Sequence, residues 1–300
     1  MTRVRDARFE LLGVDDRDAL GEGPWWDTIG ERLWWVDIRG AVIRNATLDG
    51  VEAARLQAPS SVGFAVPDDT GGLFAGLRDG LYRHTAVAGW RQVWAGDYDS
   101  SDHRVNDGKS DRHGNLWFGT MHDPETEQSS AFYRTVDGRV ERVFSGVTTS
   151  NGLGWAPDGG TFYYTDSLAR KIWAFDCDPE SGALSNRRVF AEDPRGYVPD
   201  GLTVDADGAV WAAKWDGGKI VRYRPDGTTD VELRLPVRRP TSAMFVGADL
   251  STLAVTSANL TPDDGELAGA VFLIPTTTSG LPQTRARVAP EGGASPAITE

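Results

Sequence analysis

The chain has 300 residues, of which 44 are acidic and 31 are basic, and its formal net charge is −13. This negative charge argues against a nucleic-acid backbone or an anionic membrane surface as its partner. Hydrophobic residues make up 40% of the chain, enough for a sizeable core, and no segment is long and apolar enough to span a membrane.

Cysteine content and the N-terminus indicate a reducing compartment. Cys177 is the one cysteine, so no intramolecular disulfide can form, and its alternating strand context indicates a structural role. The first twelve residues have no apolar core of signal-peptide length. We therefore expect a cytoplasmic protein, a monomer or small homo-oligomer, that acts on a small molecule rather than on nucleic acid or a membrane.

A pattern recurs along the chain: a turn rich in Asp and Gly, an aromatic or apolar strand, a short break and a second strand. The predicted strand pairs, in chain order, are 33–37 with 42–45, 73–77 with 80–83, 116–118 with 131–134, 161–164 with 171–175, 209–212 with 219–223, and 252–255 with 269–273. The anchor residues of the first strands recur roughly every 39 to 48 residues, which is the length of a propeller blade.

Six such units account for nearly the whole chain and predict a single six-bladed β-propeller domain, residues 1–290, followed by a flexible tail, residues 291–300. We expect the N-terminal segment Phe9–Leu12 to complete the last blade beside the C-terminal strands, because closure hides sheet edges that would otherwise aggregate. A β-sandwich is the alternative, and six regular copies argue against it.

The segment from Arg104 to Met121 has two halves. Arg104–Gly108 is polar and broken by glycine, so we expect a loop rather than a packed strand, whereas Leu116–Thr120 predicts a strand. Three other stretches also place one oxygen-bearing side chain beside a glycine or proline, just ahead of a strand. Because equivalent positions of different blades face one another across the channel, four side chains should converge there: Glu22, Asn106, Asn151 and Asp200.

Two carboxylates and two amides form a hard-oxygen set that suits Ca²⁺, Mg²⁺ or Mn²⁺, with Zn²⁺ or Fe²⁺ as borderline cases. Three protein ligands would leave positions for water and substrate, as in a catalytic metal site. Arg104 could stabilise a developing oxyanion, and Asp200 could take a proton from water. Each residue alone is an ordinary turn or surface residue, so the hypothesis depends on their equivalent placement.

At these residues the sequence resembles the SMP-30/gluconolactonase family of sugar lactonases. The resemblance covers nearly the whole chain, and its motifs stand in the family's order: Gly21–Trp25, Arg104–Lys109, Trp117–Met121, Asn151–Leu153, Tyr164–Ser167, Ser185–Arg187, Pro199–Gly201 and Trp211.

The resemblance implies a six-bladed propeller with one divalent metal ion in its channel. It implies that Glu22, Asn151 and Asp200 bind the metal, that Arg104 and Asn106 hold the substrate, and that Asp200 is also the general base. The implied reaction is hydrolysis of a glucono-, xylono- or arabinono-lactone to its aldonic acid, with the native metal open among Ca²⁺, Zn²⁺, Mn²⁺, Mg²⁺ and Fe²⁺.

Some members of the family carry an acidic residue shortly after Gly-Thr-Met that contacts the substrate. We include Asp123 among the substrate-binding residues, and it remains open whether His122 or Glu125 makes this contact instead. Polar Arg104, Asn106 and Asp123 favour a sugar over the alternative substrates, an aryl ester, a phosphotriester or an acyl-lactone. A non-enzymatic propeller that binds a metal or a protein partner is the alternative of a different class.

Overall fold

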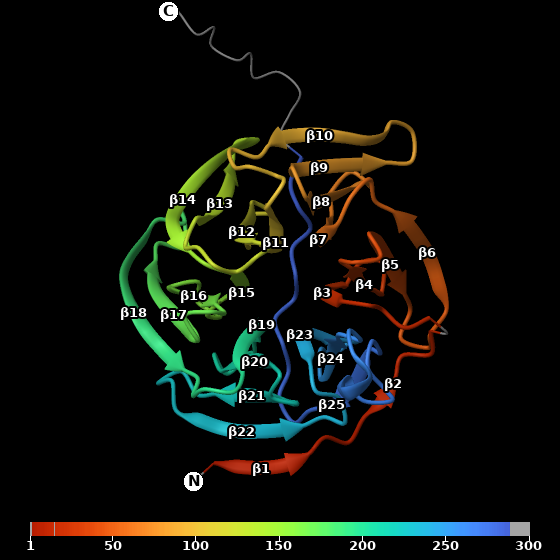
Figure 1. The fold of residues 1–300 in the computed structure, drawn as a ribbon, viewed down its shortest axis with the longest axis vertical. Coiled ribbons are helices and arrows are strands. Elements are labelled where there is room, and N and C mark those ends of the chain that lie inside the picture. Colours follow the sequence, from red (N-terminus) through yellow and green to blue (C-terminus); the bar gives the residue numbers. More distant parts are fainter. Residues whose placement is uncertain (1, 15, 289–300) are drawn as a thin grey trace, which may run out of the picture.

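A computed structural model describes residues 2–14 and 16–288 and shows six sheets arranged in a ring around a central channel (Figure 1). The chain is thus a six-bladed β-propeller, as predicted. Within these residues the only helical element is the short 3₁₀ turn η1 (Pro262–Asp264), and no helix there is long and apolar enough to cross a membrane. The predicted tail, residues 291–300, lies outside the described residues.

Each blade is a sheet of four strands that run antiparallel from the channel outward. The innermost strands of blades one to six are β3 (Gly21–Asp27), β7 (Val62–Pro67), β11 (His103–Ser110), β15 (Ser150–Trp155), β19 (Val198–Val204) and β23 (Pro240–Val246). The second strands are β4 (Arg32–Asp37), β8 (Leu73–Leu77), β12 (Leu116–His122), β16 (Thr161–Asp166), β20 (Val210–Trp215) and β24 (Thr252–Ser257). The third strands are β5 (Val42–Ala46), β9 (Gly80–Thr85), β13 (Ser130–Val136), β17 (Lys171–Cys177), β21 (Lys219–Tyr223) and β25 (Phe272–Pro275). The outer strands are β6 (Glu52–Gln57), β10 (Gly89–Ala95), β14 (Arg139–Val147), β18 (Leu184–Glu192), β22 (Thr229–Arg234) and β2 (Glu10–Leu11).

The N-terminal segment closes the ring. Strand β2 is the outer strand of blade six, where Glu10 pairs with Leu273 and Leu11 with Phe272, so the predicted closure at residues 9–12 is confirmed. Strand β1 (Arg3–Asp6), which the sequence pattern did not predict, adds a fifth, parallel strand to blade five beside β22. The first twelve residues therefore connect the last two blades.

Leu12 follows β2 and is 2% exposed in the core beside blade six. Leu12→Ala should therefore lower the free energy of unfolding by about 2–5 kcal/mol, because it leaves a cavity where the ring closes. Urea unfolding measures this loss, with Val87→Ala as the control, because Val87 is 99% exposed. A loss no larger than that of the control would show that this closure contributes little to stability.

The Asp–Gly turns of the repeat have a common structure. The carboxylate of Asp111 accepts the backbone N–H groups of His113 and Asn115, and its second oxygen accepts the indole N–H of Trp117. Asp205 accepts two backbone N–H groups of its turn and the indole of Trp211 in the same way. One carboxylate thus fixes both the turn and the aromatic side chain that starts the next strand, which explains why these residue types recur together.

The prediction that Arg104–Gly108 forms a loop is wrong. These residues belong to strand β11, which is buried along its whole length. The pairing of β11 with β12 shifts register between Val105 and Asp107, and each of the other five innermost strands has a similar shift. A β-bulge of this kind bends the strand and redirects its side chains. Gly and polar residues therefore stand inside these strands, at the level where side chains meet across the channel.

The glycines of these bulges are required by close packing between blades. A Cβ on Gly152 would stand 2.5 Å from the carbonyl oxygen of Asp200, and a Cβ on Gly63 would stand 2.3 Å from that of Asn106. Both distances are shorter than real Cβ contacts allow. The Asn-Gly and Asp-Gly pairs that resemble turns in the sequence are thus points where neighbouring innermost strands touch.

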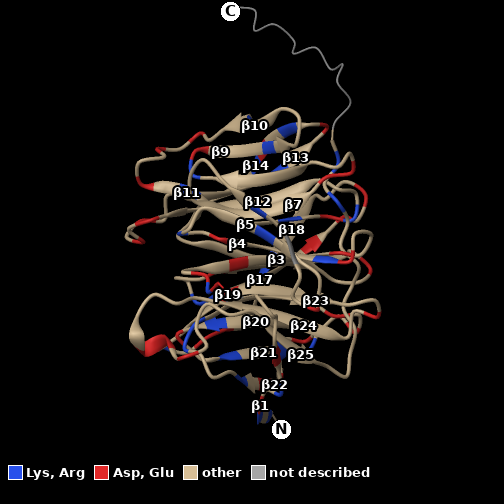
Figure 2. Cartoon of the chain, turned by 90° about the vertical axis from the view of Figure 1, so that its right-hand side faces the viewer, with Lys and Arg blue, Asp and Glu red and all other residues tan. Residues whose placement is uncertain are grey.

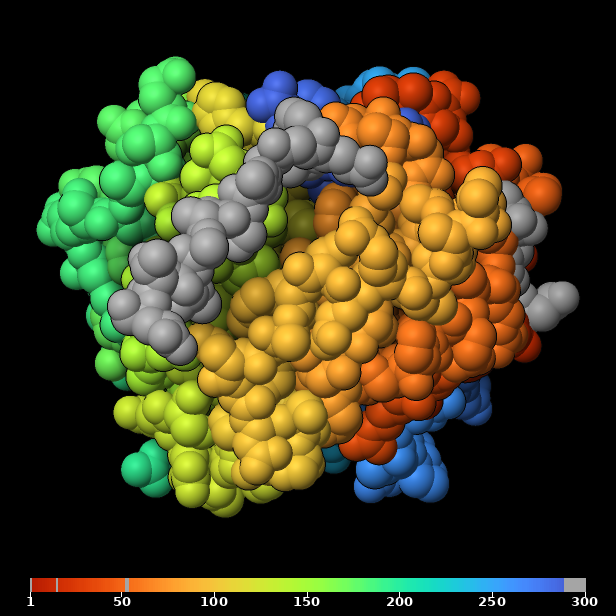
Figure 3. Space-filling model, turned by 90° about the horizontal axis from the view of Figure 1, so that it is seen from above, coloured from red at the N-terminus to blue at the C-terminus, as the bar shows by residue number. Residues whose placement is uncertain are grey.

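Seen from the side, charged residues gather in the turns at the two faces of the disc, with both signs present on each face (Figure 2). Seen from above, residues of blades two and three (orange to green) pack side by side to form the outer wall (Figure 3). After β25 the chain crosses one face of the ring, as the blue segment in Figure 1 shows. This crossing segment, residues 279–288, is attached to blade five through Ser279, to blade three through Thr284 and to blade one through Arg285.

Candidate active site

A cavity of about 300 Å³ lies at the end of the channel where the innermost strands begin. Five of the predicted site residues share its wall: Glu22 of β3, Arg104 and Asn106 of β11, Asn151 of β15 and Asp200 of β19. All five are less than 10% exposed. Four blades thus contribute polar side chains to one cavity, at equivalent positions near the bulge of each innermost strand.

Asn151 and Asp200 are in direct contact, because the Asn151 amide donates a hydrogen bond to the Asp200 carboxylate. The same amide nitrogen lies 3.2 Å from the hydroxyl of Ser167. The Asn106 amide donates to the carbonyl oxygen of Ser150 at 2.7 Å, next to Asn151 in the chain. These contacts connect three blades and hold the amide side chains in fixed orientations around the cavity.

Arg104 is held from two sides. Its Nη1 donates to Asn106 Oδ1 at 2.7 Å, and its Nε donates to Asp123 Oδ1 at 2.9 Å. The second oxygen of Asp123 accepts a hydrogen bond from Arg78 at 2.6 Å. The Asp123 carboxylate therefore lies between Arg104 and Arg78. Asp123 contacts Arg104 but does not line the cavity.

Glu125 lines the cavity, and its carboxylate lies 3.3 Å from the hydroxyl of Thr149. Its backbone has φ of 57°, an unusual value for a glutamate, and it follows directly after Pro124. His122 is buried, but it does not line the cavity and instead packs beside the ring of His103. Of the three residues left open by the sequence, Glu125 is therefore the one that faces the site.

The buried carboxylates are poorly compensated. Burial raises the pKa of Glu22 well above its usual value, and the nearby Asp200 and Asp107 carboxylates raise it further. Burial also raises the pKa of Asp200, Asp107 adds to this effect, and the Asn151 amide opposes it. Neither Glu22 nor Asp200 takes part in an ion pair between described residues. The cavity thus holds two carboxylates that are unstable as anions without an added positive charge.

Asp107 and Lys109 lie deeper in the channel, and the sequence analysis gave neither a role. Burial raises the pKa of Asp107, and Lys109 partly opposes this effect. Lys109 is 7% exposed, donates to the carbonyl oxygen of Leu202 at 2.6 Å, and interacts electrostatically with Asp107 and Glu22. The signal that could have identified them is the charge of the Asn106–Lys109 segment itself, because charged residues buried in a strand need a partner or a function.

The donor set fits a hard divalent cation. Two carboxylates and a side-chain amide are oxygen ligands of the kind such ions prefer, and a cation would offset the repulsion between Glu22 and Asp200. No three His, Cys, Asp or Glu side chains among the described residues are grouped as a metal site.

Comparison with known proteins identifies the family. The sequence pattern of the SMP-30/gluconolactonase/LRE-like region matches residues 20–259. A pentonolactonase of Haloferax volcanii is 35% identical over 92% of this chain and 97% of its own, and an L-arabinolactonase of Azospirillum brasilense is 34% identical over 97% of this chain and 100% of its own. A calcium-binding protein, regucalcin, from Agrobacterium tumefaciens has a structure that superimposes with a TM-score of 0.89 and 25% identity, covering 96% of this chain and 100% of that one. The chain therefore belongs to the SMP-30/gluconolactonase/LRE-like family.

Proposed function

We propose that the protein hydrolyses a sugar lactone, such as a glucono-, xylono- or arabinono-lactone, to the aldonic acid in a reaction that depends on one divalent metal ion. The observation that carries this proposal is the pair of buried carboxylates of Glu22 and Asp200, which form no ion pair among the described residues and share one cavity with Asn151 and the cation Arg104. The relatives support the reaction class, since one is a pentonolactonase and another an L-arabinolactonase.

Glu22, Asn151 and Asp200 would hold the metal ion, and the candidate ions are Ca²⁺, Zn²⁺, Mn²⁺, Mg²⁺ and Fe²⁺. When bound, such an ion supplies positive charge that polarises a carbonyl group and lowers the pKa of nearby water. It would also keep Glu22 and Asp200 ionised at neutral pH, because the charge offsets their mutual repulsion.

The side chains of the cavity account for the remaining steps. Arg104 and Asn106 bind the lactone through its carbonyl and hydroxyl oxygens, and the Arg104 guanidinium stabilises negative charge on the carbonyl oxygen. Asp200 accepts a proton as water adds to the carbonyl carbon, and it returns this proton to the ring oxygen as the ring C–O bond breaks. The product carries a carboxylic acid, which releases its proton at neutral pH, and a free hydroxyl group.

A turnover panel in a pH-stat tests this proposal. It compares xylono-, arabinono- and gluconolactone with phenyl acetate and an aryl phosphotriester, before and after chelation and with each metal added back. We expect hydrolysis of the lactones only, lost on chelation and restored by metal. Unchanged lactone hydrolysis after complete chelation would remove the metal from the mechanism.

A non-enzymatic metal-binding propeller is the second candidate. It is favoured by the structural similarity to regucalcin of Agrobacterium tumefaciens, which is described as a calcium-binding protein. It predicts stoichiometric metal binding at the same three ligands without hydrolysis of any lactone. The pH-stat panel, combined with metal analysis of the purified protein, separates the two candidates.

Asp123 and Glu125 should differ in how they affect substrate binding. Because Asp123 contacts Arg104, Asp123→Asn should raise KM in the wild-type protein but have little further effect in an Arg104→Gln background. Glu125→Gln should raise KM by a similar factor in both backgrounds, because Glu125 faces the cavity from another position. A double-mutant cycle on KM measures this difference, and additive effects for Asp123 would contradict its role through Arg104.

A further inference from the structure

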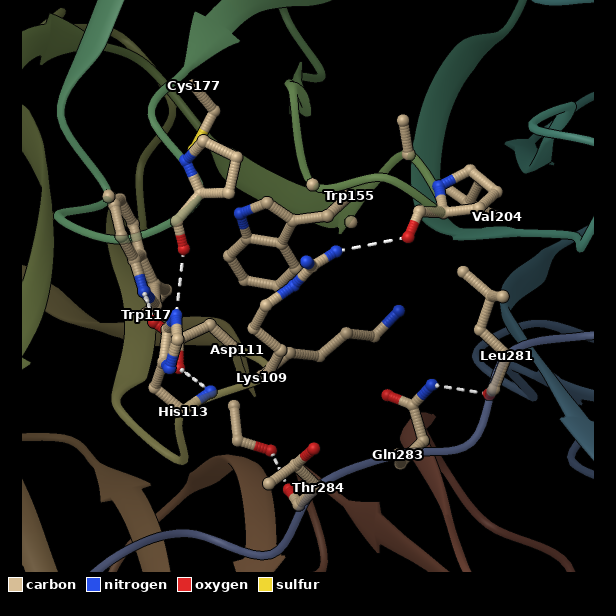
Figure 4. A pocket seen from close by; sticks show the side chains of 18 of the residues that line it. Lys109, Asp111, His113, Trp117, Trp155, Cys177, Val204, Leu281, Gln283 and Thr284 are labelled. Carbon is tan, nitrogen blue, oxygen red and sulfur yellow. Dashed lines mark hydrogen bonds between the residues drawn. The ribbon is translucent and has the colours of Figure 1, made fainter.

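A second cavity, of about 420 Å³, lies at the opposite end of the channel (Figure 4). The active-site cavity is lined by the first residues of the innermost strands, whereas this cavity is lined by their last residues, such as Ser110, Trp155 and Val204. Ser110, Trp155 and Val204 each stand four positions after an active-site residue of the same strand, namely Asn106, Asn151 and Asp200. Four positions correspond to about 13 Å along a strand. The two cavities are therefore distinct and open at different faces.

Blades three, four and five form most of the second cavity, and the crossing segment covers one side. Thr284 of this segment accepts a hydrogen bond from the hydroxyl of Ser110 through its carbonyl oxygen, and Arg285 forms an ion pair with Asp27 at 2.6 Å. The segment is thus fixed in place, and the cavity has the volume of a small-molecule site.

One wall of the second cavity is aromatic. The partly exposed indole of Trp155 stands in the middle of the view in Figure 4, packed edge to face against Trp117. Val204 and Leu281 extend the apolar surface on the far side. These side chains give the cavity apolar surface against which a flat apolar group can pack.

The charged groups that remain available in the cavity are cations. Lys109 extends across it in Figure 4. The exposed Arg112 also lines the cavity, and its guanidinium donates to the carbonyl oxygen of Pro157 at 3.1 Å. Neither cation takes part in an ion pair between described residues. Although burial lowers the pKa of Lys109 to about 8, the amine remains largely protonated at neutral pH.

The two carboxylates on the same wall are already occupied. Asp111 accepts four hydrogen bonds from its own turn and from Trp117. Asp178 accepts the backbone N–H groups of Glu180 and Ser181 and the hydroxyl of Ser181. An incoming anion therefore meets the N–H donors of Lys109 and Arg112, whereas both oxygens of Asp111 and one oxygen of Asp178 already accept hydrogen bonds.

We infer that this second cavity binds a small organic anion with a flat apolar body, such as an aromatic carboxylate. The ring packs against Trp155, and the carboxylate lies between Lys109 and Arg112. None of these three residues lines the active-site cavity, and Lys109 interacts electrostatically with Glu22 at the other end of the channel.

Isothermal titration calorimetry with 2-naphthoate and its neutral amide, 2-naphthamide, tests the inference. We expect one site for 2-naphthoate, with the amide bound about tenfold more weakly because it lacks the charge. Arg112→Gln and Trp155→Leu should each weaken 2-naphthoate binding by about fivefold or more, and both positions are partly or fully exposed, so the fold should persist. Arg91→Gln, a similarly exposed arginine on β10, should leave binding unchanged.

Arg104→Gln separates this site from the active-site cavity, since Arg104 is the cation of that cavity. Retained 2-naphthoate binding in Arg104→Gln, together with loss in Arg112→Gln and Trp155→Leu, supports the second site. Binding that is absent in the wild type, lost in Arg104→Gln, or unaffected by both Arg112→Gln and Trp155→Leu overturns it.

Discussion

Asp200→Asn is expected to lower kcat/KM for lactone hydrolysis by about 10²–10⁴-fold, the range for loss of a general base. The asparagine keeps the shape of the side chain, but it can neither accept the proton of the attacking water nor supply charge to a metal ion. Steady-state kinetics in a pH-stat measure the loss. Asp226→Asn makes the same chemical change in an exposed turn of the same blade and should leave kcat/KM unchanged.

The same substitution should stabilise the protein when no metal is bound. Asp200 is buried beside Glu22 and Asp107, and its raised pKa shows that the folded protein disfavours its anion. A neutral amide removes this repulsion, so thermal unfolding of chelated Asp200→Asn should occur at a higher temperature than that of the chelated wild type. A variant that is both fully active and no more stable would contradict the role given to Asp200.

Metal-free protein should lose stability as the pH rises towards neutrality through the titration of Glu22, Asp107 and Asp200. Burial raises all three pKa values above those of the unfolded chain. The contribution of these groups is therefore fully present below the unfolded carboxyl pKa of about 4 and is lost as the pH rises through their folded values. A bound divalent cation reverses this loss, because it stabilises the ionised carboxylates.

Thermal unfolding at pH 5 and pH 8, with chelator and with each metal, measures this effect. At a metal concentration of about 100 times the Kd at pH 8, the stabilisation at pH 8 is roughly 2.7 kcal/mol. We expect the same concentration to stabilise less at pH 5, because protonated carboxylates bind metal more weakly. Glu22→Gln should greatly reduce the metal effect at both values. An equal metal-induced shift at both pH values, or a full shift in Glu22→Gln, would place the metal elsewhere.

The sequence predicts the ring well because the signal is local and repeated. Second and third strands such as Leu73–Leu77 and Lys219–Tyr223 combine apolar residues with a preceding turn, and this pattern depends on few distant contacts. The closing strand at Glu10–Leu11 follows from the need to cover the open edge of blade six. The parallel strand β1 was not predicted, since its four residues are exposed and polar and their pairing is set by the surface of blade five.

The innermost strands are where local rules fail. Asn106, Asn151 and Asp200 stand next to glycines that indicate turns in the sequence, whereas in the structure these glycines allow close packing between bulged strands. The structure nevertheless places these three residues on the wall of one cavity, as their equivalent positions in the repeat predict. The placement of Asp123 behind Arg104, and of Glu125 on the wall, depends on the path of a loop after β12 that residue types alone do not determine.

The most direct test of the account is anomalous diffraction from crystals of the protein soaked with Mn²⁺. We predict one strong peak in the active-site cavity, coordinated by oxygen atoms of Glu22, Asn151 and Asp200, and no such peak in crystals of Asp200→Asn. A peak bound by other residues, or none in a protein that hydrolyses lactones under the same conditions, would contradict the account.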